Sequence, residues 1–269
     1  MRGVRRLFVT GLGGHLGSEL GRRAPAAGWE LHGITGSAQL DVRDAAAVLA
    51  CVRAARPDVV VHTAYRLDDP SVNVEGTRAV AAAAVDGGAR LVHLSSDVVF
   101  PGTGARALTE DDEPRPVTEY GASKLEAERL CPPDAVIVRT SLIYGGAEPA
   151  PQERMVLEVA DGARDMAFFT DEVRCPIEVG DLAAAVLELA ELGFDPAHPP
   201  PTGPLHVAGA DVLSRLDFAR LVCAHRGRDP GVLRGAPAGP DRPKHLVLDS
   251  TRARALLRVR LRGAREVLA

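Results

Sequence analysis

Short apolar runs alternate with longer segments rich in alanine and leucine along the first 145 residues. The apolar runs are continuous, which is typical of parallel strands buried on both faces. They span residues 6–10, 29–34, 59–63, 91–95 and 136–140. The segments with helical patterns between them span residues 16–24, 45–55, 72–85 and 123–130. This alternation predicts an α/β fold with a parallel sheet covered by helices on both sides.

The pattern changes beyond Gly145. A loop rich in proline and alanine at 147–152 precedes a helix at 181–192, with Asp181 as its predicted N-cap. A short helix is expected from Thr251. Between these helices we expect a proline-rich link, a strand, a helix, a loop rich in glycine and proline, and a last strand, at residues 195–204, 205–208, 214–226, 234–243 and 246–248.

A glycine-rich loop follows the first predicted strand and opens the first predicted helix. Gly11, Gly14 and Gly17 have the spacing Gly-x-x-Gly-x-x-Gly. Such a loop permits a tight turn, close approach of the backbone to a pyrophosphate, and close packing of the helix on the strand. The helix N-terminus then offers free N–H groups to the phosphates. The sequence therefore predicts a dinucleotide site, with a ligand-free turn as the alternative. Its loop residues are Gly11, Gly13, Gly14, His15, Leu16 and Gly17.

The choice between NADPH and NADH depends on the tip of the second predicted strand. NAD-binding sites usually carry an acidic residue there, about 20 residues after the glycines, but this tip has no carboxylate. The sequence therefore favours NADPH, with Ser37 and either Arg22 or Arg23 near the 2′-phosphate, and leaves NADH open. The two arginines could equally belong to a solvated helix end. We expect Asp41 and Val42 next to the adenine, although Asp41 could instead cap the following helix.

Tyr120 and Lys124 form the sharpest motif in the chain. The chain has three tyrosines, and its only lysines are Lys124 and Lys244, so a chance Tyr-x-x-x-Lys is a poor explanation. Residues four apart share one face of a helix. An ammonium next to a phenol favours the phenolate and lowers the pKa of that phenol. A phenol tuned in this way can give a proton to a carbonyl oxygen as hydride reaches the carbon; the alternative is a surface pair.

A hydroxyl partner for this pair is expected where the fourth predicted strand ends, because open α/β sheets bind ligands at their carboxyl ends. Ser95 and Ser96 occupy that position. Neighbouring strand residues face opposite ways, so only one of them can serve. We favour Ser96, whose hydroxyl would hold the substrate oxygen.

The three motifs, in this order and spacing, resemble those of the extended short-chain dehydrogenase/reductase superfamily. Over nearly its whole length the chain resembles the dTDP-4-dehydrorhamnose reductase family within it. The more specific matches are residues 96–104, 109–111, 139–145, 242–243 and 248–250. The resemblance implies a Rossmann-type doubly wound parallel sheet with a small C-terminal substrate-binding lobe. We expect the NADP(H)-binding Rossmann domain at 1–145, with 178–208 returning to it, and the lobe at 146–177 and 209–269.

The resemblance also implies roles for individual residues. Ser96, Tyr120 and Lys124 become the catalytic triad, and Asp97 and Arg242 become substrate-binding candidates. Along the nicotinamide side the resemblance places Thr63, Ala64 and Asn73.

Two positions depart from the family pattern. The family usually has an aromatic residue where Val98 stands and a tryptophan where Leu142 stands, both near the sugar. The only tryptophan here is Trp29, in the second predicted strand. The hydride chemistry is therefore expected to be retained and the sugar pocket altered. A 4-keto-6-deoxy nucleotide sugar similar to dTDP-4-dehydrorhamnose is the expected substrate, and another natural-product ketone stays open.

Other functions within the superfamily fit less well. Related dehydratases usually place Asp-Glu after the catalytic hydroxyl, whereas Asp97 is followed by Val98, and epimerases typically show a serine-rich run without Asp. The family also resembles the regulatory subunit of methionine adenosyltransferase, a non-catalytic dinucleotide-binding partner protein. The complete set of Ser96, Tyr120 and Lys124 favours a reductase over that alternative.

Composition narrows the remaining choices. The chain has 269 residues, a net charge of −4 and 46% hydrophobic residues, which is typical of a globular protein and gives no basic surface for nucleic acid. No segment is apolar for long enough to span a membrane. The four cysteines and eight histidines show no metal-ligand spacing, so we predict no metal, and inert thiols in a reducing compartment. His62 and His93 are expected in the core. We expect a soluble, cytoplasmic monomer or homodimer that binds a small-molecule substrate, no nucleic acid and no membrane.

Overall fold

The buried apolar runs of the sequence form one parallel sheet. The computed structural model describes residues 4–194 and 200–269. Within these residues six strands pair in the order β10-β5-β4-β3-β1-β2, and all of the pairs are parallel. Their bounds are β1 Arg5–Thr10, β2 Trp29–Ile34, β3 Val59–His62, β4 Arg90–Ser96, β5 Val136–Thr140 and β10 Gly203–His206. The predicted parallel sheet is confirmed.

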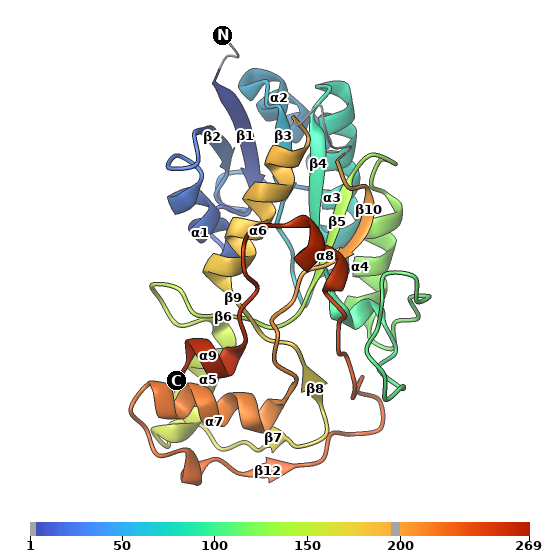
Figure 1. Cartoon of the computed structure of the whole chain (residues 1–269). Helices are drawn as coiled ribbons and strands as arrows, with labels where there is room; N and C mark the ends of the chain where they lie inside the picture. Colours follow the sequence, from blue (N-terminus) through green and yellow to red (C-terminus); the bar gives the residue numbers. More distant parts are fainter. Residues whose placement is uncertain (1–3, 195–199) are drawn as a thin grey trace.

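Helices cover both faces of this sheet (Figure 1). On one face α1 (His15–Arg23) and α6 (Val179–Leu192) pack together and share an apolar core with the strands. On the other face α2 (Ala45–Ala55) packs on α3 (Pro70–Asp86), and α3 packs on α4 (Glu119–Arg129). The sheet is therefore doubly wound, as predicted.

The strand order changes direction between β1 and β3, since β2 lies beyond β1 and β4 lies beyond β3. Open α/β sheets bind ligands at such a switch point, outside the carboxyl ends of the strands. The glycine-rich loop follows β1, and Thr63 and Ala64 follow β3. The fold thus brings these two segments to the place where a cofactor is expected.

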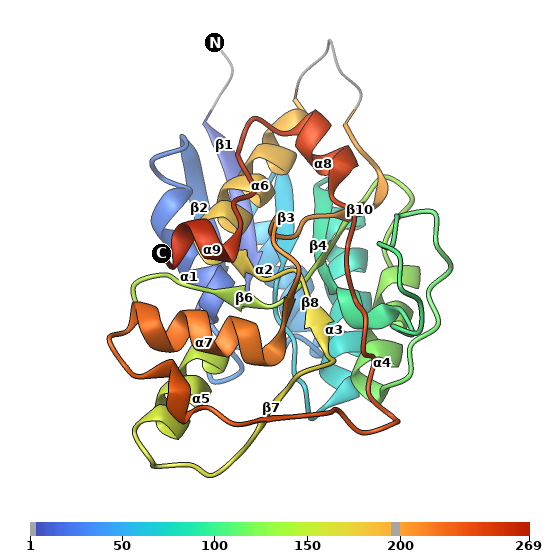
Figure 2. The ribbon, with the colours of Figure 1, turned by 60° about the horizontal axis from the view of Figure 1, so that its bottom comes forward.

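The second half of the chain adds a smaller group of elements at one end of the sheet, which Figure 2 brings forward. Its helices are α5 (Pro151–Ala160), α7 (Arg215–His225) and α9 (Ala264–Val267). Three two-stranded pairs accompany them: β6 Ile143–Tyr144 with β9 Ile177–Glu178, β7 Phe168–Phe169 with β12 Gly235–Ala236, and β8 Val173–Arg174 with β11 Leu213–Ser214. Tyr144, Val156, Phe168 and Phe218 belong to an apolar cluster of this end, separate from the two clusters that flank the sheet.

Several local predictions for this half are wrong. The N-cap of α6 is Glu178, whose side chain accepts a hydrogen bond from the backbone N–H of Asp181 at 2.9 Å. Instead of a strand at 246–248, isolated bridges join His245 to Val173 and Leu248 to Leu108. A further helix, α8 (Thr251–Leu256), does begin at Thr251. Helix α5 was not expected, and part of the predicted link at 195–204 lies outside the described residues. These elements are short and depend on contacts with distant segments, which periodicity does not reveal.

No helix within residues 4–194 and 200–269 is long and apolar enough to cross a membrane. Cys51, Cys131, Cys175 and Cys223 are all free thiols. Burial raises the pKa of Cys175 to about 11, so this thiol stays protonated at neutral pH.

Candidate active site

The glycine-rich loop is held tightly against the tip of β2. The backbone N–H groups of Gly11 and Leu12 donate to the carbonyl of Ile34 at 2.8 and 3.0 Å. Gly11 has a φ of 76°, which favours glycine. A Cβ atom at Gly17 would lie 1.9 Å from the carbonyl oxygen of Gly11, so only glycine lets α1 begin this close to the loop. The tight turn and the close packing predicted for these glycines are present.

The N-terminus of α1 is open to an anion. Its N-cap is Gly14, which has no side chain and so makes no side-chain capping bond. The N–H groups of the first turn, at His15, Leu16 and Gly17, therefore lack the side-chain cap that most helices carry. Gly13 donates its N–H to the carbonyl of Thr35 at 2.8 Å. The loop and the uncapped helix together form an anion-binding cradle.

Thr63 and Ala64 lie directly against this cradle. A Cβ atom at Gly11 would lie 2.9 Å from Thr63 Oγ1 and 3.0 Å from the backbone nitrogen of Ala64. The hydroxyl of Thr63 donates to the carbonyl of Thr10 at 2.7 Å, which ties the end of β3 to the end of β1. The two segments predicted along the cofactor therefore meet at the switch point of the sheet.

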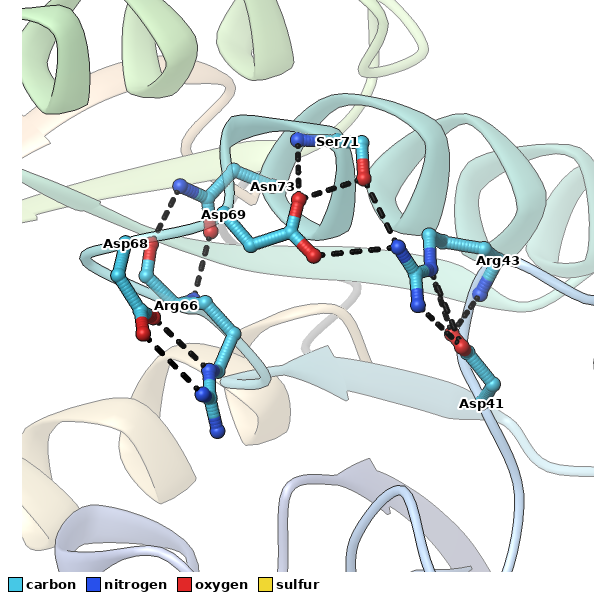
Figure 3. A network of polar contacts seen from close by, with 7 residues as sticks. All are labelled: Asp41, Arg43, Arg66, Asp68, Asp69, Ser71 and Asn73. Carbon is cyan, nitrogen blue, oxygen red and sulfur yellow. Dashed lines mark hydrogen bonds and ion pairs between the residues drawn. The ribbon is translucent and has the colours of Figure 1, made fainter.

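The loop after β2 carries Ser37, Asp41 and Val42. Ser37 is exposed, and Val42 is buried against Gly76 of α3, where a Cβ atom would lie 2.7 Å from Val42 Cγ2. Asp41 accepts hydrogen bonds from Arg43 Nε and Nη2 at 3.0 and 2.6 Å (Figure 3). The Arg43 guanidinium lowers the pKa of Asp41 to about 2. Asp41 therefore stays ionised and paired, and the cap of α2 is Asp44 instead.

Arg22 and Arg23, which the sequence offered as contacts of a 2′-phosphate, contact another residue in the structure. Both guanidinium groups donate to the Glu19 carboxylate on the same helix. The Arg23 guanidinium also lies against Gly180 at the start of α6, where a Cβ atom would be 2.3 Å from Arg23 Nη2. Arg23 therefore packs at the contact of α1 with α6, and both arginines pair with Glu19, as expected for the alternative of a helix end.

Asn73 joins the first turn of α3 to the helix of the Tyr-x-x-x-Lys motif. Its amide oxygen accepts from the N–H of Arg66 at 2.9 Å, and its amide nitrogen donates to the carbonyl of Arg66 (Figure 3). The amide nitrogen also donates to Ser123 Oγ at 2.9 Å. Ser123 lies in α4, between Tyr120 and Lys124. Asn73 therefore fixes the segment after β3 relative to that helix.

Tyr120 and Lys124 lie one turn apart on α4, as predicted. Thr118 caps this helix, which begins at Glu119, earlier than its sequence pattern indicated. A Cβ atom at Gly121 would lie 2.2 Å from the carbonyl oxygen of Val98. The start of α4 thus packs directly on the turn that follows Ser96.

The two side chains have different surroundings. Lys124 is 3% exposed, and its ammonium donates to the carbonyl of Leu94 at 2.5 Å. Tyr120 is half-buried, and its ring centroid lies 6.0 Å from that of Tyr65. Burial lowers the pKa of Lys124 to about 8. Burial also raises the pKa of Tyr120, and the neighbouring Tyr65 and Asp97 add to this shift.

The predicted lowering of the Tyr120 pKa is therefore wrong for this arrangement, because burial of the phenol dominates its surroundings. A phenol with a raised pKa keeps its proton at neutral pH. That state is the one required of a proton donor.

The structure separates the two serines at the end of β4. The hydroxyl of Ser95 is buried and donates to the Glu128 carboxylate at 2.5 Å. Ser96 is half-buried at the last position of the strand, and its hydroxyl donates to Asp97 Oδ1 at 3.2 Å. Neighbouring strand residues face opposite ways, so Ser96 is the serine left for a substrate.

Asp97 begins the short 3-10 turn Asp97–Val99 and is almost fully buried. Its second carboxylate oxygen accepts from Ser141 Oγ at 2.7 Å and lies 3.7 Å from Arg174 Nε. Burial raises the pKa of Asp97, and Arg174 and Ser141 partly offset that rise. Asp97 is thus a structural partner of Ser96 as well as a substrate-binding candidate.

The remaining substrate-binding candidates come from separate segments. Val98 and Leu142 are half-buried aliphatic side chains. Arg242 donates to Glu172 Oε2 at 2.6 Å, and its guanidinium lies 4.7 Å from the centroid of the Phe169 ring. Glu172 and Arg174 were missed by sequence reasoning. No local spacing signals them, because their contacts with Asp97 and Arg242 join segments that are distant along the chain.

The histidines have no common site. His62 is buried, and its two ring nitrogens lie 2.6 and 3.1 Å from the hydroxyl oxygens of Thr10 and Thr77. Burial lowers the pKa of His62 to about 3 and lowers that of His93 as well. Both are core residues, as predicted, and His198 lies outside the described residues. Across the described ranges, no group of three or more His, Cys, Asp or Glu side chains could hold a metal ion.

Comparisons with known proteins agree with this geometry. A family model described as RmlD substrate binding domain matches residues 5–269. This chain belongs to that family.

Two RmlD-family relatives and one solved structure illustrate the similarity. The dTDP-4-dehydrorhamnose reductase of Mycolicibacterium smegmatis is 35% identical over 98% of this chain and 84% of its own length. The dTDP-4-keto-6-deoxy-D-glucose reductase of Streptomyces niveus is 32% identical over 90% of this chain and 88% of its own. A crystal structure of dTDP-4-dehydrorhamnose reductase from Bacillus anthracis in complex with NADP has a TM-score of 0.84 and 23% identity, covering 98% of this chain and 97% of the other. At 23% identity, the similarity to the Bacillus anthracis structure shows the fold alone.

Proposed function

We propose that this chain is an NADPH-dependent ketoreductase that reduces a 4-keto-6-deoxy sugar nucleotide. The observation that supports the proposal is the packing of α4, which carries Tyr120 and Lys124, on the end of β4 and the turn after Ser96. The names of the RmlD-family relatives, which refer to reductases of dTDP-linked keto sugars, support the substrate class. NADH stays open as an alternative cofactor.

The residues of the cradle fit a dinucleotide. Gly11 and Gly17 leave no room for a Cβ atom, and the N-terminus of α1 carries no side-chain cap. The pyrophosphate is assigned to this loop, the nicotinamide side to Thr63 and Ala64, and the adenosine side to the loop after β2. When bound, the cofactor supplies the hydride.

The side chains of the motif then have distinct tasks. Tyr120 holds its proton because burial raises its pKa, and it gives that proton to the ketone oxygen as negative charge develops there. The buried ammonium of Lys124 lies one turn away on α4 and stabilises the phenolate that remains. Ser96 orients the ketone oxygen by a hydrogen bond. Asp97, Val98, Leu142 and Arg242 are assigned to the substrate.

The deciding experiment follows the loss of NADPH absorbance when the protein meets a dTDP-4-keto-6-deoxyhexose, with NADH in parallel. Turnover with NADPH is the expected result. Tight NADPH binding without turnover would contradict the substrate assignment, because Val98 and Leu142 would then define a pocket for a different ketone. A chain that binds NADPH and reduces no ketone would instead fit a regulatory dinucleotide-binding protein.

We also propose the domain division and the compartment stated above. The apolar cluster of the small lobe begins at Tyr144, which supports a boundary near Gly145. Ala253, Leu257 and Leu261 belong to the apolar cluster of the sheet, so this part of the chain packs with the Rossmann domain. The four free cysteines support a reducing compartment, and hence the cytoplasm. Light scattering of the purified protein distinguishes the expected monomer from a homodimer.

A further inference from the structure

Buried polar side chains connect the glycine-rich loop with the helix that carries Tyr120. We call them the buried path; its members, in spatial order, are Thr10, His62, Thr77, Asn73 and Ser123. Each of them is at most 5% exposed. Thr10 is the last residue of β1 and directly precedes Gly11, whereas Ser123 lies in α4. The path therefore leads from the proposed cofactor side to the element that carries the proposed proton donor.

The hydrogen bonds of the path have one consistent direction. A carbonyl oxygen only accepts, so the Thr77 hydroxyl gives its one proton to the carbonyl of Asn73, at 2.6 Å. Thr77 Oγ1 then accepts from His62 Nε2 at 3.1 Å. Burial lowers the pKa of His62 to about 3, so its ring is neutral and carries a single proton. His62 Nδ1 therefore accepts from the Thr10 hydroxyl at 2.6 Å.

Asn73 continues the path to α4. Its amide nitrogen donates to Ser123 Oγ at 2.9 Å, and the Ser123 hydroxyl donates to the carbonyl of Tyr120 at 2.8 Å. At the other end of the path, the backbone N–H of Ala64 donates to Thr10 Oγ1 at 3.4 Å. Consecutive hydrogen bonds thus join the segment after β3 and the end of β1 to the backbone of Tyr120.

The path lies where the strands end. Residues two apart in a strand share one face, and the residues two places before Thr10 and His62 are Phe8 and Val60, which belong to the apolar cluster on that side of the sheet. An apolar side chain at position 62 would continue this core. A fully paired polar network instead fixes one arrangement, because a shift of any member leaves a buried group unpaired. The polar side chains therefore add geometric precision at the carboxyl edge of the sheet.

We propose that His62 is a positioning residue for the reduction, which together with Thr77 holds the glycine-rich loop in a fixed position relative to the helix of Tyr120. The pyrophosphate is assigned to that loop and the proton to Tyr120, and a misplacement of about 1 Å can lower a rate by roughly 100-fold. His62 is 1% exposed, so it acts through its two hydrogen bonds and not on the substrate. The inference rests on the proposed function for the reaction, whereas the state of the His62 ring is measured without turnover.

The first measurement is ¹⁵N NMR of the histidine rings, with histidine-labelled protein in the absence and presence of NADPH. We expect the proton of His62 on Nε2 and none on Nδ1 throughout the neutral pH range. NADPH should shift the ring signals of His62, because Thr10 directly precedes Gly11, and should leave those of the exposed His225 unchanged. In Thr77→Val the Nε2 signal should move, because its acceptor is lost.

The second measurement compares the turnover of Thr77→Val and Thr77→Ser. Thr77→Val removes the hydroxyl with little change of shape, and should lower kcat about 10-fold while KM and NADPH affinity stay within about twofold. The kinetic isotope effect with NADPH deuterated at C4 of the nicotinamide should rise, because misplaced groups slow the hydride step itself. Thr77→Ser keeps the hydroxyl and should recover most of kcat.

Thr140→Val is the matched control. The buried hydroxyl of Thr140 donates to the carbonyl of Val207 at 2.8 Å, outside the path. This variant therefore loses the same kind of hydrogen bond as Thr77→Val, and its kcat and isotope effect should stay within about twofold of wild type. A loss of turnover that merely reflects lower stability would appear in both variants.

His62→Leu interrupts the path on both sides of the ring. It should lower kcat at least as much as Thr77→Val, and the double variant should lose little more, because both changes break the same connection. Thr77→Val decides the question if His62→Leu does not fold.

Three outcomes would overturn the inference: a proton on His62 Nδ1 in the wild type, bound NADPH that leaves the His62 signals unshifted, or a kcat of folded Thr77→Val no lower than that of Thr140→Val. The expected ring state and NADPH shift, without reduction of any dTDP-linked keto sugar, would support the connection of His62 to the loop and contradict the proposed reductase activity. Reduction that is unaffected by Thr77→Val would support the reductase and contradict the positioning role.

Discussion

The cofactor side and the substrate side of the candidate active site are built in different ways. The proposed cofactor side is centred on two contiguous segments, the glycine-rich loop 11–17 and the helix turn 120–124. The proposed substrate-binding residues Asp97, Val98, Leu142 and Arg242 come from three segments that are far apart in the chain. The difference indicates that the chemistry is specified locally, whereas the choice of substrate depends on how distant segments pack.

The largest effect is expected from removing the phenol hydroxyl of Tyr120. Tyr120→Phe should lower turnover by about 10³-fold, because the proton donor is removed, while NADPH affinity stays within about twofold. Stopped-flow NADPH oxidation and a fluorescence titration measure the two effects. Tyr144→Phe is the control, since Tyr144 is buried in the small lobe. Full activity in Tyr120→Phe would remove Tyr120 from the mechanism.

A side chain at Gly17 should weaken NADPH binding and lower the stability of the folded protein. Gly17→Ala places a methyl group 1.9 Å from the carbonyl oxygen of Gly11, so the loop or α1 has to move. We expect a loss of about 3 kcal/mol in unfolding free energy, as for severe overpacking, and roughly 100-fold weaker NADPH binding. Gly239→Ala is the control, because nothing lies within 4 Å of a Cβ atom there and the residue is outside the proposed cofactor side. Urea unfolding and NADPH titration measure the two effects. Equal stability and equal NADPH affinity in the two variants would contradict the assignment of the pyrophosphate to this loop.

The buried lysine should make stability depend on pH. The pKa of Lys124 in the folded protein is about 8, below its usual value of 10.5, because of burial. Between these two pH values the unfolded chain holds more protons, so this residue's contribution to stability rises with pH, by about 3 kcal/mol in all. The stability that Lys124→Met gains over wild type should therefore be largest at pH 7 and smallest near pH 10.5.

Urea unfolding of wild type and Lys124→Met across this pH range provides the measurement. Lys244→Met, which removes the half-exposed lysine, is the matched control. A stability difference between Lys124→Met and wild type that does not change with pH would show that Lys124 is protonated equally in the folded and unfolded states.

The smallest expected effect concerns the 2′-phosphate. Ser37 is exposed in the loop after β2, which offers no carboxylate at the strand tip. Ser37→Asp should weaken NADPH binding about fivefold by like-charge repulsion in a solvent-exposed position, and should leave NADH binding nearly unchanged. Ser37→Asn, of similar size and neutral, is the control. Equal effects on both cofactors in the titration would place the 2′-phosphate elsewhere.

Much of the fold was predictable because the buried strands have continuous apolar runs and the glycines and the Tyr-x-x-x-Lys pair have fixed local spacing. Strand alternation indicated that only one of Ser95 and Ser96 faces the site, and the structure shows that Ser95 is the one buried against Glu128. The start of α6 was mispredicted because Glu178, and not Asp181, provides the cap. The pKa of Tyr120 was mispredicted in direction because its burial follows from packing, which local spacing does not report.

The sequence by itself determined the doubly wound sheet, the dinucleotide cradle and the placement of Tyr120 beside Lys124. Each of these follows from periodicity or from steric demands within a few residues. Only the tertiary structure decided that Ser95 is buried against Glu128, and that Glu172 pairs with Arg242. The physical reason is that electrostatic pairing and burial depend on distances between atoms, and segments far apart in the chain acquire those distances only when they pack.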